Sequence, residues 1–191
     1  MARTVIALLL FVVACLLAGL YGMLHNQISY TVSPEYFTKF KFQQFNVPAG
    51  IPDRIGAAIV GWNASWWMGI VIGIFLIPFG LLIRGSRAYL FGMLKVFCVV
   101  LATTIALGLV SLAIAFVTID SDATGTVSRY NNEMADTAAF LRAGAMHNSS
   151  YAGGLVGIFT GGFTVIRIFL KGEAKSESET TDNSVDSQPA V

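Results

Sequence analysis

The stretch Arg84-Gly85-Ser86-Arg87 separates two long apolar runs, residues 57–83 and 88–119. Each run exceeds the roughly 20 residues that a helix needs to cross about 30 Å of hydrocarbon. Because the link between them is short, the two helices are predicted to be antiparallel neighbours. Its arginines are the densest charge in any short loop of the chain, and an excess of Lys and Arg in short loops marks the cytoplasmic side. We therefore predict that this link is cytoplasmic.

The composition indicates a membrane protein. Apolar residues make up 55% of the 191 residues, and charged residues make up 12%, about half of the roughly 25% found in soluble domains. No carboxylate occurs between Asp53 and Asp120. The formal net charge of +1 gives no basic surface of the kind that nucleic-acid binding requires, so we expect no nucleic-acid partner. The length suits one compact membrane domain within the lipid bilayer.

Two further apolar segments complete a four-helix arrangement. The first, residues 5–24, follows the positive flank that contains Arg3, and it has two interpretations. A lipoprotein-type signal would be cleaved before Cys15, whereas a retained helix explains why the apolar stretch continues beyond that residue. We predict an all-α membrane protein, an antiparallel four-helix transmembrane bundle within residues 1–171. The helices are expected at about 5–24, 57–83, 88–119 and 152–170.

The segments outside these helices are predicted to be two outer loops and a tail. The extracytoplasmic loops are residues 25–56 and 120–151, about 30 residues each. The segment 172–191 is rich in Ser, Thr, Asp and Glu and has no apolar periodicity, so we expect a disordered tail. Arg167 and Lys171 mark the inner end of the fourth helix, which places both termini in the cytoplasm.

The first outer loop contains an aromatic segment. Ser33-Pro34-Glu35 is a favourable helix start, and helical spacing places Tyr36, Phe37 and Phe40 on one face. Phe42 departs from that face, and residues 39–42 alternate as in a strand. One interpretation is an amphipathic segment on the bilayer surface. The other is a docking surface through which Tyr36, Phe37, Phe40 and Phe42 bind a protein partner.

The run from Tyr30 to Phe42 resembles a segment of uncharacterised bacterial four-helix membrane proteins. The resemblance covers about a tenth of the chain. It implies a bacterial source, and hence the bacterial cytoplasmic (inner) membrane, and it implies no activity.

Glycines at four-residue spacing predict close packing of helices. Gly69 and Gly73 form a G-x-x-x-G step in the second helix. Gly153, Gly157 and Gly161 form a glycine zipper in the fourth helix. The zipper would serve either packing within the bundle or the seam of a homo-oligomer, and the sequence leaves both open.

The two histidines are candidate ligands for a metal or a haem. His25 follows the first predicted helix and His147 precedes the fourth, so both are expected at the outer membrane surface at similar depth. If these helices are neighbours, the two imidazoles can bind one metal ion or ligate a haem. Glu35, Asp53 or Asp120 would supply a further oxygen ligand. The alternative is that both histidines form hydrogen bonds with loop backbone.

The sequence contains no catalytic motif such as G-x-S-x-G or H-E-x-x-H, which favours a non-enzymatic protein without deciding the question. We expect a scaffold, assembly or accessory subunit that presents an aromatic extracytoplasmic cap to a partner. The first alternative is a metal- or haem-binding membrane protein that uses His25 and His147. The second is a small transporter or channel, with Lys95 or the stripe Thr104, Gly108 and Ser111 along the path.

Overall fold

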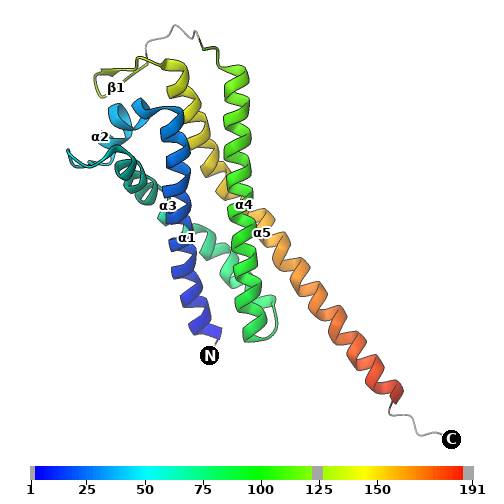
Figure 1. Cartoon of the computed structure of the whole chain (residues 1–191). Coiled ribbons are helices and arrows are strands. Elements are labelled where there is room, and N and C mark those ends of the chain that lie inside the picture. The colour runs from blue at the N-terminus through cyan, green and yellow to red at the C-terminus, as the bar shows by residue number, and fades with distance from the viewer. Residues whose placement is uncertain (1–2, 122–126, 187–191) are drawn as a thin grey trace, which may run out of the picture.

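The computed structural model of the chain describes residues 3–121 and 127–186 (Figure 1). It is mostly helical, at 85%, with five α-helices among these residues. Four of them are long and apolar enough to cross a membrane, which indicates a multi-pass membrane protein. These are α1 (Arg3–Val32), α3 (Asp53–Phe79, with the 3₁₀ turn η2 at Gly80–Leu82), α4 (Ser86–Thr118) and α5 (Thr137–Asp186). The fifth, α2 (Phe42–Gln44), is a single short turn that follows the π-helix η1 (Tyr36–Lys41).

The long helices pack chiefly as two pairs, α1 on α3 and α4 on α5, with fewer contacts between the pairs (Figure 1). A core of mainly apolar side chains from all four helices fills the space between them. Its largest fully buried member is Tyr89, whose hydroxyl donates a hydrogen bond to the carbonyl of Ile77 at 3.0 Å. The predicted glycine positions lie at these helix contacts. Gly69 and Gly73 face Cys15 and Phe11 of α1, and Gly153, Gly157 and Gly161 face Thr104, Val100 and Val96 of α4.

The helices extend beyond the limits expected from sequence. Helix α1 continues through His25 to Val32, where Ser33 and Pro34 follow. In its added turns the polar residues His25, Asn26 and Ser29 are buried, and Asn26 donates a hydrogen bond to the carbonyl of Ala57 on α3 at 3.0 Å. A polar sequence that reads as a loop therefore forms a helix because its polar groups have partners inside the protein.

Helix α5 differs most from expectation. It begins at Thr137, inside the expected second outer loop, where Asp136 accepts a hydrogen bond from the Ala139 amide at 2.8 Å, as an N-cap residue does. It also continues to Asp186, across most of the segment expected to be a disordered tail. The stretch after Gly172 contains no glycine or proline before Pro189, so no residue in it interrupts a helix.

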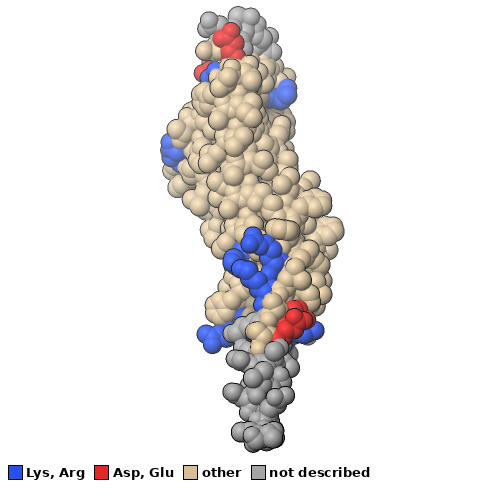
Figure 2. All heavy atoms as spheres, turned by 90° about the vertical axis from the view of Figure 1, so that its right-hand side faces the viewer, with Lys and Arg blue, Asp and Glu red and all other residues tan. Residues whose placement is uncertain are grey.

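The segments between the long helices form a small cap at one end of the molecule (Figure 1). The cap consists of η1, α2, the hairpin of β1 (Ser128–Arg129) and β2 (Asn132–Glu133), and the first turns of α5. A second cluster of buried residues forms its interior: Tyr36, Phe37, Ala57, Val60, Met134, Phe140 and Ala143. Figure 2 shows, on one face, charged side chains gathered toward the two ends of the molecule, with a band of other residues between them.

Candidate functional site

The structure brings the two histidines together. His25 lies on α1 and His147 on α5, and the centroids of their rings are 6.4 Å apart. Both side chains are buried, with 6% and 7% of their surface exposed. Both lie within helices rather than in flanking loops, because α1 and α5 extend into the expected loop segments.

Three tyrosines surround the histidine pair. The Tyr21 hydroxyl and Nδ1 of His25 share a hydrogen bond of 3.1 Å. The ring of His147 contacts those of Tyr36 and Tyr151, with centroid distances of 5.9 and 5.2 Å. These rings come from α1, η1 and α5, so the cap and the helices both contribute to the walls. We refer to His25, His147 and these three tyrosines as the histidine site.

One ring nitrogen of each histidine has no hydrogen-bond partner among the described residues. These atoms are Nε2 of His25 and Nδ1 of His147, and both are buried. Leaving a buried polar atom unpaired costs about 1–3 kcal/mol, and native structures contain few of them. The alternative expectation, hydrogen bonds to loop backbone, is therefore not met by these two nitrogens. Two such atoms on neighbouring rings are what a bound ion would satisfy.

Two of the three carboxylates that the sequence offers as further ligands are engaged elsewhere. Glu35 accepts a hydrogen bond from the Ala135 amide, just before α5, and Asp53 accepts a hydrogen bond from the Tyr30 hydroxyl at 3.1 Å. Among the described residues, no group of three or more His, Cys, Asp or Glu side chains is placed to hold a metal. Any ion at this site would therefore rest on the two imidazoles.

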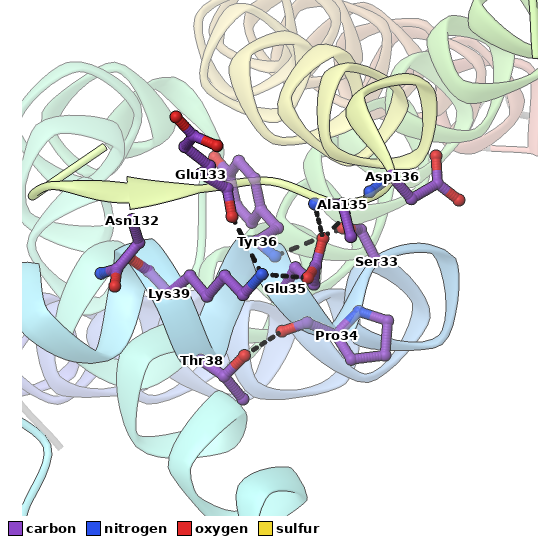
Figure 3. A network of polar contacts seen from close by, with 10 residues as sticks. All are labelled: Ser33, Pro34, Glu35, Tyr36, Thr38, Lys39, Asn132, Glu133, Ala135 and Asp136. Atoms are coloured by element: carbon purple, nitrogen blue, oxygen red, sulfur yellow. Dashed lines mark hydrogen bonds and ion pairs between the residues drawn. The ribbon is translucent and has the colours of Figure 1, made fainter. Parts of the chain in front are cut away.

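A polar network fastens the cap over the histidine site (Figure 3). Glu35 accepts hydrogen bonds from the amides of Ala135 and Asp136, at 2.8 and 3.1 Å, and forms an ion pair with Lys39. Lys39 donates to the carbonyl of Glu133 at 2.9 Å. The bond from Lys39, followed by those from the two amides, lowers the pKa of Glu35. The network ties η1, which carries Tyr36, to the strand and helix that lead to His147.

The four predicted partner-binding residues contribute to the interior of the cap. Tyr36 is 4% exposed and Phe37 is 0% exposed, while Phe40 and Phe42 are half-buried against the same cluster. The helical spacing correctly places Tyr36 and Phe40 together, since their rings are 5.5 Å apart. The sequence alone does not show that this face turns toward α5, where Phe140 packs on Tyr36 at 5.1 Å.

Lys41 is a site residue that the sequence analysis did not single out. It is buried, and its ammonium lies 4.5 Å from the ring centroid of Phe40 and 5.5 Å from that of Tyr36. It donates one hydrogen bond, to Gln44 at 2.9 Å. Burial lowers the pKa of Lys41 to about 8. The one sign of its burial in the sequence is its position between Phe40 and Phe42. The same pattern is expected of a lysine at a membrane surface, so it does not single out Lys41.

Two cavities adjoin the histidine site. One, of about 50 Å³, lies among the helices and is lined partly by Tyr21, Ser65, Thr104 and Tyr151. The other is a groove of about 340 Å³, lined mainly by apolar side chains of α1 and α4 together with Tyr21, His25 and Met146. The groove follows the gap between the two helix pairs, so His25 can be reached from it without opening the cap.

Comparison of the chain with models of protein families, with curated protein sequences and with solved structures finds no match.

Proposed function

We propose that this chain is an integral membrane protein that binds one transition-metal ion between His25 and His147. The observation that carries the proposal is the 6.4 Å between the two ring centroids, with one buried, unpaired nitrogen on each ring. A metal–imidazole bond is about 2.0 Å long and a ring nitrogen lies about 1.2 Å from its centroid, so two rings that share one ion have centroids at most about 6.4 Å apart. The observed separation is at this limit.

A single ion fits the site better than a haem. A haem ligated by both histidines would place its macrocycle between their rings and extend it sideways on all sides. Tyr36 and Tyr151 already contact the ring of His147, and Tyr21 lies 5.4 Å from that of His25. The tyrosine walls would have to move apart for a macrocycle, whereas an ion needs only the space between two nitrogens.

Metal analysis of the detergent-purified full chain tests the proposal. We expect about one metal ion per chain, its loss in His25→Ala and in His147→Ala, and its retention in the control Asn148→Ala, which alters an exposed neighbour of His147. The absorption spectrum should lack the intense band of a haem. Wild-type protein that stays metal-free after incubation with copper, zinc, iron and nickel salts would refute the proposal.

The wider architecture is part of the proposal. We infer an antiparallel four-helix membrane bundle in the bacterial cytoplasmic membrane, with both termini in the cytoplasm and the cap outside. The order of contacts along α1 and α3 supports it, because residue numbers fall on α1 as they rise on α3: Gly22 with Gly61, Gly19 with Trp62, Cys15 with Gly69 and Phe11 with Gly73. The exposed Arg84, just before α4, and the exposed Arg87, in its first turn, support the orientation.

A scaffold or accessory subunit is the second candidate, and one observation favours it. Tyr130, in the hairpin turn of the cap, is 55% exposed and its ring lies 6.1 Å from that of the half-buried Phe40. Exposed tyrosines are common anchors in protein interfaces. Loss of one reproducible partner in Tyr130→Ala, with metal content unchanged, would support this role. The transport alternative has no comparable support. Lys95 is exposed on the outside of α4, and the stripe packs against other helices: Thr104 faces Gly153 of α5, Gly108 faces His25 of α1, and Ser111 donates a hydrogen bond to Ala145 of α5.

A further inference from the structure

We propose that the ion is monovalent copper, Cu(I), held between the two imidazoles in a linear, two-coordinate arrangement. This inference rests on the proposed metal-binding function and specifies the ion. It follows from three properties of the histidine site: the separation of the rings, the number of ligands and the local charge.

The separation of the rings favours a linear arrangement. When two imidazoles bind one ion at a tetrahedral angle, as in zinc sites, their centroids lie about 5.2 Å apart. The 6.4 Å observed between His25 and His147 matches the distance for two nitrogens on opposite sides of the ion. The two ring planes are inclined at 57°, which a linear arrangement permits because each ring can rotate about the nitrogen–metal axis.

The number of ligands favours an ion that needs only two. Structural zinc is four-coordinate, and divalent iron and nickel also take four or more ligands. The described residues offer no third His, Cys, Asp or Glu to this pair. Tyr36 and Tyr151 contact the ring of His147, and the groove that reaches His25 is lined mainly by apolar side chains, which offer no further ligand. Cu(I), unlike these ions, is stable in a linear arrangement with only two nitrogen ligands.

The local charge favours a monovalent ion. The cost of moving an ion from water into a low-dielectric site rises with the square of its charge, so a divalent ion costs about four times as much as a monovalent one. Neutral imidazoles do not offset that cost. The ammonium of Lys41 adds a positive charge close to Tyr36, which itself contacts His147. The carboxylate of Glu35 is already engaged with Lys39 and two amides.

Parallel titrations of the full chain in detergent test the inference. Cu(I), kept reduced with ascorbate under anaerobic conditions, is titrated against a chromophoric Cu(I) chelator, and Zn(II) against a zinc chelator. We expect about one Cu(I) per chain, bound at least 100-fold more tightly than Zn(II), and competition by Ag(I), which shares the linear preference. X-ray absorption of the copper-loaded protein should show two nitrogen neighbours.

Variants assign the binding to the two rings. His25→Gln and His147→Gln should each weaken Cu(I) binding at least 100-fold, whereas Asn148→Ala should leave it unchanged. Because His147 lies beneath the cap, the circular dichroism and thermal unfolding of each metal-free variant are compared with those of metal-free wild type. If a variant at either position proves misfolded, the coordination number of the copper-loaded wild type decides the question.

The outcomes separate this inference from the function on which it rests. Tighter binding of Zn(II), or a copper site with three or four ligands, overturns the assignment of linear Cu(I) and leaves the metal-binding proposal standing. Failure of Cu(I), Zn(II) and the other tested ions to bind overturns both. Copper that binds equally well to both histidine variants overturns the assignment to this site.

Discussion

At the scale of single residues, Lys41 gives the clearest dependence on pH. Burial beneath aromatic rings lowers the pKa of Lys41 from 10.5 to about 8. In the unfolded chain the pKa of Lys41 keeps its ordinary value of 10.5. Between about pH 8 and pH 10.5 the unfolded state therefore carries a proton on Lys41 that the folded state has released. The free energy of unfolding therefore rises with pH across this window, by about 3 kcal/mol in all at 1.36 kcal/mol per pKa unit.

Unfolding in detergent, followed by circular dichroism between about pH 7.5 and 9.5, measures this rise below the range in which exposed tyrosines ionise. Lys41→Met should be more stable than wild type at about pH 7.5. Its free energy of unfolding should rise much less between about pH 7.5 and 9.5 than that of wild type. Lys39→Met serves as the control, since it weakens the bonds to Glu35 and Glu133 yet leaves Lys41 in place. A rise of equal size in wild type and Lys41→Met would show that another group is responsible.

The histidine pair could be anticipated at the residue scale, whereas its surroundings could not. His25 and His147 are the only histidines in the sequence, and each flanks an apolar segment at its expected outer end. Their similar depth can therefore be predicted from the sequence. Tyr21 and Tyr151 lie at the same depth, but a tyrosine there is equally expected as an interfacial anchor. Its contact with a histidine depends on the rotation of two helices about their axes. The apolar stretches of the sequence predict where the helices are, but they do not predict how each helix is rotated about its axis.

At the scale of helices, Gly61 and Gly22 pack backbone against backbone where α1 meets α3. A Cβ built on Gly61 would overlap the carbonyl oxygen of Gly22 and lie 2.8 Å from the amide nitrogen of Met23. Backbone cannot move aside as a flexible side chain can. We expect Gly61→Ala to force the helices apart, with a loss of stability on the order of 2 kcal/mol or more and weaker metal binding at His25.

The control is Gly172→Ala on α5, where a Cβ meets nothing within 4 Å. An exposed helical glycine replaced by alanine should gain about 0.5–1 kcal/mol. Thermal unfolding of the two variants beside wild type gives opposite signs if the packing is as described. Equal behaviour of Gly61→Ala and Gly172→Ala would mean that the two helices do not touch at this point.

The four long helices were predictable because hydrophobic length alone identifies them, and their ends were not. Ser29 and Asn26 look like loop residues, yet both are buried within α1, where Asn26 bonds to α3 and Ser29 donates to the sulfur of Met146 on α5 at 3.4 Å. A local sequence pattern cannot predict hydrogen bonds to partners that are so distant in the sequence. The same holds for the approach to α5, where Glu35 of the other outer segment accepts hydrogen bonds from the amides of Ala135 and Asp136, just before the helix begins.

At the scale of the whole molecule, the positions of charged residues predict the depth of the histidine site in the proposed membrane arrangement. At 1.5 Å per residue, His25 lies about 33 Å along α1 from Arg3, and His147 lies about 30 Å along α5 from Arg167. These distances match the roughly 30 Å of a bilayer's hydrocarbon. If the arginines mark the inner boundary, both imidazoles lie at the outer boundary, directly beneath the cap. An ion would then arrive from the extracytoplasmic side.

Labelling with a membrane-impermeant maleimide on intact cells tests this orientation. In a chain whose native Cys15 and Cys98 are replaced by alanine, Ser86→Cys, between Arg84 and Arg87, reports on the start of α4. Gln43→Cys, at an exposed position of α2, reports on the cap. We expect Gln43→Cys to be labelled on intact cells and Ser86→Cys only after the membrane is opened, because the arginines hold the turn on the cytoplasmic side. The reverse pattern would invert the molecule and place the histidine site at the inner surface. Labelling of both residues on intact cells would show that the segment between them does not cross the membrane.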